Sequence, residues 1–164
     1  APGLTWSRLE WLRSLTGLPL VVKGVLTAED ALLCAEHGAE GIVVSNHGGR
    51  TLDTSPASVE ALPAIAEAVG DRTELYLDSG IRRGTDVLKA LALGARAVLV
   101  GRPLFWGLAI DGDRGVSSMF EILRSEFDSA LAFTGVTTLD QIGRSLVTTP
   151  DERYGDRSAA GQGG

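Results

Sequence analysis

The sequence predicts an α/β fold built from about four βα units. Four short apolar runs begin near Leu20, Gly41, Leu75 and Ala97, and they alternate with segments of helical periodicity. Short runs rich in β-branched residues are typical of buried parallel strands, and their alternation with helices is the pattern of βα units. A complete (β/α)8 TIM barrel needs roughly 200 to 250 residues. The 164 residues of this chain are too few for a complete barrel, and its four βα units correspond to half of one.

Capping residues and glycines predict where the helices begin and end. Thr27 with Asp30 resembles a capping box, and Gly38 ends that helix just after His37, whose imidazole is expected in solvent. The other helices are expected over residues 5–15, from Ser55-Pro56 to Gly70, from Thr85 or Asp86 to Gly94 and from about Val116 to Ala132, with a short turn over residues 104–109.

Apolar side chains at helical spacing predict the buried faces. In the last helix Met119, Phe120, Leu123 and Phe127 are expected to make core contacts. Cys34 is the one cysteine of the chain, so an internal disulfide is excluded and a buried core thiol is expected.

The composition indicates one acidic domain over residues 1–148. The chain is 44% hydrophobic with a net charge of -6, which argues against nucleic acid as a partner. No apolar run approaches 18 residues and no signal peptide is evident, so a soluble protein without membrane contact is expected. Of its 15 basic residues, only Lys23 and Lys89 are lysines. This preference suggests a GC-rich bacterial genome and a cytoplasmic location. Residues 149–164 are polar and rich in Gly, Ser and Ala, which predicts a flexible C-terminal tail.

The turn after the second predicted strand carries the first candidate site. Residues 45–50 read Ser-Asn-His-Gly-Gly-Arg, which places His47 and Arg50 three residues apart. Imidazole accepts and releases protons near neutral pH, and a guanidinium can hold a carboxylate with two parallel hydrogen bonds. Because active sites of barrels lie at the carboxyl ends of the strands, this turn predicts a base and a carboxylate clamp.

Two further clusters follow the third and fourth predicted strands. Residues 78–84 read Asp-Ser-Gly-Ile-Arg-Arg-Gly, and residues 101–103 read Gly-Arg-Pro. Glycine lets backbone N–H groups approach an anion, arginine supplies donors for phosphate oxygens, and the loops after the last two strands of a barrel commonly bind phosphate. The two clusters therefore predict one phosphate site.

These segments, together with residues 18–25 and 89–95, resemble the FMN-dependent 2-hydroxy-acid oxidases and dehydrogenases, the family of glycolate, lactate and mandelate oxidases. The resemblance runs from about Thr5 to about Val147 and corresponds to the C-terminal half of the family's TIM barrel. It implies FMN as cofactor, a small (S)-2-hydroxy acid as substrate and a 2-keto acid as product. It also implies a complementary N-terminal half as partner and a homo-oligomer, a tetramer, for the complete enzyme.

The resemblance assigns roles residue by residue. His47 is the base, Arg50 binds the substrate carboxylate, and Lys23 lies against the N1 and C2 carbonyl edge of the flavin. Lys23 ends an otherwise apolar predicted strand, where an unpaired ammonium needs a partner. The remaining FMN-binding residues implied are Ser45, Asp78, Gly80, Arg82, Gly101 and Arg102.

Two positions depart from the family pattern. Ser79 stands where glycine is common and Thr51 where glutamine is common, as in aryl-glycolate oxidases, which favours mandelate-like substrates over lactate or glycolate. Two alternatives stay open: another FMN- or phosphate-binding barrel enzyme, and a non-catalytic half-barrel fragment. The sequence also leaves open the electron acceptor, and whether the reaction proceeds by hydride transfer or through a carbanion.

Overall fold

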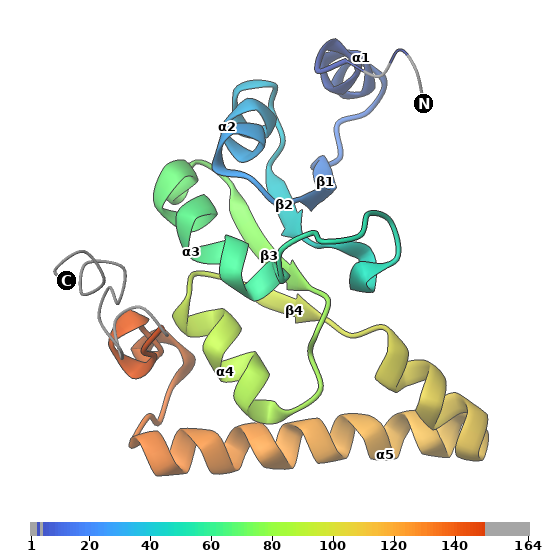
Figure 1. Cartoon of the computed structure of the whole chain (residues 1–164), viewed down its shortest axis with the longest axis vertical. Coiled ribbons are helices and arrows are strands. Elements are labelled where there is room, and N and C mark those ends of the chain that lie inside the picture. The colour runs from blue at the N-terminus through green and yellow to red at the C-terminus, as the bar shows by residue number, and fades with distance from the viewer. Residues whose placement is uncertain (1–2, 4, 150–164) are drawn as a thin grey trace, which may run out of the picture.

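Four parallel strands form the centre of the fold (Figure 1). The computed structural model describes residue 3 and residues 5–149. The strands pair in the order of the sequence, β1-β2-β3-β4, which is the order that successive right-handed βα units produce. Their bounds are β1 Val21–Val25, β2 Gly41–Val44, β3 Glu74–Asp78 and β4 Ala97–Leu99.

Three helices connect the strands and cover one face of the sheet, on the left in Figure 1. They are α2 (Ala28–Glu36), α3 (Ser58–Val69) and α4 (Gly84–Ala92). The helix α1 (Ser7–Leu15) precedes the sheet, and the long α5 (Arg102–Thr134) follows it and packs against α4. Short 3-10 turns lie at η1 His47–Gly49, η2 Gly70–Arg72, η3 Leu139–Gln141 and η4 Arg144–Leu146.

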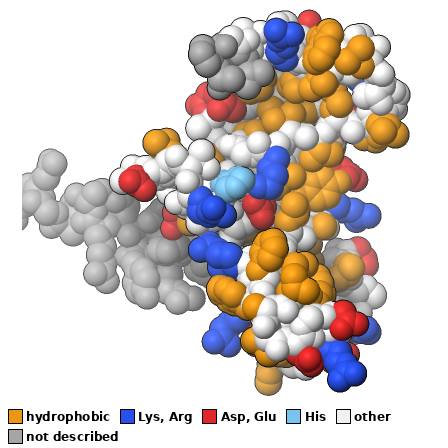
Figure 2. Space-filling model, turned by 90° about the vertical axis from the view of Figure 1, so that its right-hand side faces the viewer, with side chains coloured by type: hydrophobic (Ala, Val, Ile, Leu, Met, Phe, Trp, Pro, Cys, Tyr) orange, Lys and Arg blue, Asp and Glu red, His pale blue; other side chains and the backbone are white. Residues whose placement is uncertain are grey.

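The core lies between the sheet and the helices α2 to α4. Its fully buried side chains include Ile42 and Val44 of β2, Leu77 of β3, and Leu62 and Ile65 of α3. Successive residues of a strand point to opposite faces, so Lys23 and Asp78 lie on the other face. That face is shown in Figure 2, where charged side chains gather around a histidine beside hydrophobic side chains.

Several helix predictions are confirmed. The Thr27 hydroxyl accepts a hydrogen bond from the Asp30 amide at the start of α2, as its capping pattern predicts. Cys34 is buried, as expected, and burial raises the pKa of its thiol to about 11.

Other predictions about the helices are wrong. The helix α3 begins at Ser58, three residues after the predicted start at Ser55, and the backbone of Ala57 before it is extended. The Pro56 carbonyl accepts a hydrogen bond from the Asn46 side chain. The expected turn over residues 104–109 is helical, since Pro103 favours the first turn of a helix. It forms the first part of α5, which is interrupted where Gly112 has a φ of +53°.

The prediction of core contacts for the last helix holds in part. Leu123 is buried, and Met119 and Phe127 are half-buried, whereas the Phe120 side chain is 49% exposed. The helix α5 packs on α4.

His37 is not the solvated imidazole that the sequence predicts. Its Nδ1 lies 2.8 Å from Oε1 of Glu10, and its ring stacks on Trp6. The helix pattern predicted from the sequence could not show this contact, because Glu10 belongs to α1. The same helix forms a second contact, an ion pair from Arg13 to Glu40.

In the part of the chain that the structure describes, no helix combines the length and the hydropathy needed to cross a membrane.

A single glycine lets α4 approach α5. A β-carbon on Gly84 would collide with the backbone nitrogen of Phe127, and the Gly84 amide donates a hydrogen bond to the Glu126 carboxylate at 2.8 Å. Gly84→Ala is therefore expected to lower the free energy of unfolding by about 1–3 kcal/mol, measured by urea denaturation. Gly17→Ala is the control, because open space surrounds that position. Equal stability of the two variants would contradict this account of the helix contact.

Candidate active site

The candidate site lies at the carboxyl ends of the strands, where three loops meet. One pocket is lined by residues from β1, from the η1 turn after β2, from the loop after β3 and from the start of α5 after β4. Eight of the nine residues selected from the sequence line it: Lys23, His47, Arg50, Asp78, Gly80, Arg82, Gly101 and Arg102. The ninth, Ser45, is buried and hydrogen-bonded to three of them, Lys23, His47 and Asp78.

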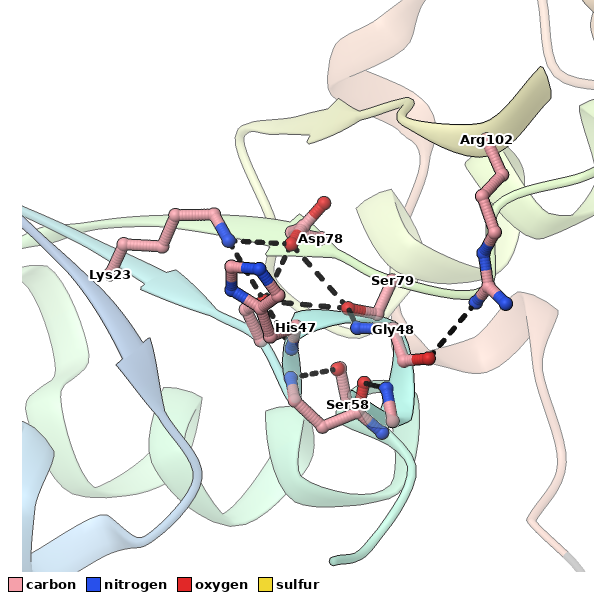
Figure 3. Close-up of polar contacts among 10 residues, drawn as sticks. Lys23, His47, Gly48, Ser58, Asp78, Ser79 and Arg102 are labelled. Carbon is pink, nitrogen blue, oxygen red and sulfur yellow. Dashed lines mark hydrogen bonds and ion pairs between the residues drawn. The ribbon is translucent and has the colours of Figure 1, made fainter. Parts of the chain in front are cut away.

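An ion pair on the open face of the sheet connects β1 with β3 (Figure 3). Nζ of Lys23 lies 2.8 Å from Oδ2 of Asp78. The Ser45 hydroxyl, directly after β2, donates to the same carboxylate oxygen at 2.5 Å and accepts from Nζ of Lys23 at 3.2 Å. Ser45 thus bridges the two charges across the intervening strand.

These contacts control the charge of Asp78. Partial burial by itself would raise the pKa of Asp78, but the hydrogen bonds from Lys23 and Ser45 and the positive charge of Lys23 outweigh it. The pKa of this carboxyl is therefore held below its usual value, and Asp78 is a carboxylate at neutral pH.

The turn that carries His47 has an uncommon backbone. His47, Gly48 and Gly49 have φ values of +56°, +69° and +73°, and a positive φ is unfavourable for a residue with a β-carbon such as His47. Hydrogen bonds from outside the three residues hold this conformation. The Asn46 side chain accepts from the Gly49 amide, and the Ser45 hydroxyl accepts from the His47 amide at 3.0 Å.

Side chains from other elements also form hydrogen bonds with this turn. The Ser58 hydroxyl of α3 accepts from the Asn46 amide at 3.1 Å. The Ser79 hydroxyl accepts from the Gly48 amide at 2.9 Å, and Nη2 of Arg102 donates to the Gly48 carbonyl at 3.2 Å. Figure 3 shows the His47 ring on the side of this turn where Lys23 and Asp78 lie. The strained turn therefore presents an exposed imidazole at a defined place.

The arginines lie around the pocket in different settings. The guanidinium of Arg82 lies 5.0 Å from the centre of the Trp106 ring, a cation–π contact, and it donates to the Ile81 carbonyl. Arg102 is the first residue of α5, so it lies at the positive end of that helix. Arg50 follows η1 and is exposed at the pocket.

Three aspects of the site differ from the sequence reasoning. Lys23 was expected at the end of its strand, but β1 continues to Val25, and Lys23 reaches the site because its long side chain extends along the open face. Ser79 contacts the His47 turn, although the sequence indicated only a departure from glycine. Phe105 also lines the pocket, a contribution missed because its segment was expected to be a turn.

Asp78→Asn tests the charged network. Because the pKa of Asp78 is held below its ordinary value of 3.8, the carboxylate stabilises the fold above that pH. This stabilisation is lost as the pH falls through the lowered pKa. The difference in unfolding free energy between wild type and Asp78→Asn is therefore expected to be larger at pH 7 than at pH 3 in urea denaturation. Asp128→Asn, at an exposed position of α5, serves as control. A difference independent of pH would contradict an ionised Asp78.

Comparisons with known proteins agree on one family. The family model of the FMN-dependent dehydrogenases matches residues 1–149. The chain is 53% identical over 146 residues to 2-hydroxyacid oxidase 1 of Mus musculus and 54% identical over 146 residues to L-lactate oxidase of a Nostoc species. Each match covers 89% of this chain and 40% of the relative. The crystal structure of mandelate oxidase with (S)-2-phenylpropionate matches with a TM-score of 0.83 and 48% identity, over 86% of this chain and 42% of that one.

The matches also define how much of the family's fold is present. The chain spans about two fifths of the length of the curated relatives it matches. Its parallel sheet with helices on one face is part of a (β/α)8 barrel, as the sequence predicts. On the family model and these identities, the chain belongs to the FMN-dependent dehydrogenase family.

Proposed function

We propose that this chain carries the catalytic and phosphate-binding part of an enzyme that oxidises a small (S)-2-hydroxy acid to the 2-keto acid with FMN. The observation that carries the proposal is that Lys23, His47 and Arg50 line the same pocket as the two glycine–arginine loops. A base, a carboxylate-binding group and a site for phosphate are thus within one concave surface. Family membership adds support, because the family is defined by its dependence on FMN.

The residues present fit FMN. At Gly80 and Gly101 the space that a β-carbon would occupy is open among the described residues, so a ligand can approach the backbone there. Arg82 and Arg102 add two guanidinium groups to the same pocket, and the first turn of α5 adds the partial positive charge of a helix N-terminus. These groups would hold the phosphate. Asp78 can accept from hydroxyls of the ribityl chain, with Ser45 beside it.

When bound, FMN supplies the two-electron acceptor of the reaction. Lys23 would place its ammonium against the polar edge of the ring system, where it stabilises the negative charge that reduction brings. Its pairing with Asp78 and Ser45 keeps the ammonium at a fixed position. Lys23 thus has ionic and hydrogen-bonding partners within the chain, and its charge would also stabilise the reduced flavin.

His47 would take one proton from the substrate during oxidation. Its imidazole is exposed at the pocket and is held by a turn whose amides are tied to Ser45 and Ser79. Arg50 would bind the substrate carboxylate with two parallel hydrogen bonds and so orient the carbon that is oxidised. Both side chains extend from one short turn, so substrate binding and proton removal are positioned together.

We further propose a mandelate-like substrate in preference to lactate or glycolate. The proposal rests on Ser79 and Thr51, and the similarity to mandelate oxidase agrees with it, whereas the relatives also include a lactate oxidase. Comparing the rates of flavin reduction by (S)-mandelate, lactate and glycolate tests this preference.

The other half of the barrel would complete the pocket, because the face of the sheet that carries Lys23 and Asp78 is open. The homo-oligomer, the bacterial cytoplasm and the flexible tail, whose residues 150–164 lie outside the described residues, stay predictions.

His47→Gln in the FMN-loaded enzyme that contains this chain tests the base. Flavin absorbance should be retained, while the rate of anaerobic flavin reduction by substrate should fall by roughly 10²-fold or more. His37→Gln is the matched control, because that imidazole contacts Glu10 and Trp6 away from the pocket. Reduction of the His47→Gln enzyme at the wild-type rate in stopped-flow experiments would refute the assignment.

Arg50→Lys and Arg50→Met test the carboxylate clamp. A lysine offers a point charge and methionine no charge, so kcat/KM should fall in the lysine variant and fall further in the methionine variant. Steady-state kinetics with mandelate and lactate measure both effects. Arg124→Lys, on the exposed surface of α5, is the control. Unchanged kcat/KM in both Arg50 variants would place carboxylate binding elsewhere.

A further inference from the structure

Ser79 adopts a backbone conformation that its residue type disfavours. Its φ is +79°, in the left-handed region where glycine has no steric penalty and a side chain with a β-carbon does. The neighbouring Gly80, with a φ of +90°, shows that the loop after β3 requires such angles. Glycine at position 79 would therefore relieve strain, whereas serine offers a hydroxyl that glycine lacks.

The Ser79 hydroxyl connects two loops of the candidate site. It accepts a hydrogen bond from the Gly48 amide at 2.9 Å, and it lies 3.4 Å from both Oδ2 of Asp78 and the Ser45 hydroxyl. The Ser45 hydroxyl in turn accepts from the His47 amide. Two successive amides of the strained turn are thus held by hydroxyls that converge on one carboxylate oxygen (Figure 3).

We propose that Ser79 is a positioning residue for the proposed oxidation, because its hydroxyl holds the Gly48 amide and so fixes the turn that carries His47. The inference rests on the proposed role of His47 as the base. The hydrogen bonds of the Ser79 hydroxyl within the described residues go to Gly48, Ser45 and Asp78, not to the side chains of His47 or Arg50. Its effect passes through the backbone of the turn, which Arg102 holds from the other side at the Gly48 carbonyl.

Two variants separate the effect of the Ser79 hydrogen bond from the effect of backbone strain. Ser79→Ala keeps the β-carbon and loses the hydrogen bond, whereas Ser79→Gly loses the hydrogen bond and removes the steric penalty. If Ser79 positions the turn, both variants should lose flavin-reduction rate to a similar extent, roughly tenfold, the factor expected for one hydrogen bond. Their thermal stabilities should differ, with Ser79→Gly melting at the higher temperature. A merely structural role would make the rate follow the melting temperature.

Hydrogen exchange tests the inference without reference to activity. In the FMN-loaded enzyme, exchange of the Gly48 amide, followed by mass spectrometry of peptides spanning residues 45–50, should be faster by roughly tenfold in both variants. Ser129→Ala, whose hydroxyl bonds within α5, should leave that exchange unchanged. Unchanged Gly48 exchange in Ser79→Ala, or a rate that follows melting temperature across the two variants, would overturn the proposal.

The exchange result also separates this inference from the proposed function. If the wild-type enzyme failed to oxidise any 2-hydroxy acid, the proposed function would be refuted, and the role of Ser79 in positioning a catalytic base would be refuted with it. If wild type were active and exchange were unchanged in Ser79→Ala, only the positioning role would fail. Faster exchange with an equal loss of rate in both variants would support both.

Discussion

The carboxylate of Asp78 is the interaction on which the site depends. One oxygen of this group meets the ammonium of Lys23 at 2.8 Å and the hydroxyl of Ser45 at 2.5 Å. These three residues come from β1, from the end of β2 and from β3, so the carboxylate ties three adjacent strands together at their carboxyl ends. A buried charge is tolerated when it is paired and hydrogen-bonded, and here the pairing also places a cation in the pocket.

The His47 turn shows how a strained segment is kept in place. Three successive residues have left-handed backbone angles, and His47 bears the steric cost of a β-carbon at positive φ. Hydroxyls of Ser45, Ser58 and Ser79 and the guanidinium of Arg102 hold the turn from separate elements. The conformation therefore belongs to the folded state, and the exposed imidazole is carried by a backbone that is fixed on several sides.

The arrangement of layers explains why the site faces one direction. The helices α2 to α4 bury one face of the sheet, and their side chains form the core with Ile42, Val44 and Leu77. The other face carries Lys23 and Asp78 and adjoins exposed apolar groups such as Val21, 52% exposed. Polar and apolar groups share this open face. The complementary half of the proposed barrel would therefore bury apolar surface and enclose the Lys23–Asp78 pair at the same time.

The resemblance to a known family indicated the residues that meet in the pocket, and the sequence by itself determined the four strands, the burial of Cys34 and the turns at the strand ends. Local patterns carry this information, because strand periodicity and glycine-rich turns at strand ends depend on neighbours along the chain. Only the tertiary structure decided that Lys23 pairs with Asp78, that Ser79 holds Gly48 and that His37 meets Glu10. Each of these contacts joins residues 27 or more positions apart, so its geometry follows from strand register and helix packing, which no local pattern contains.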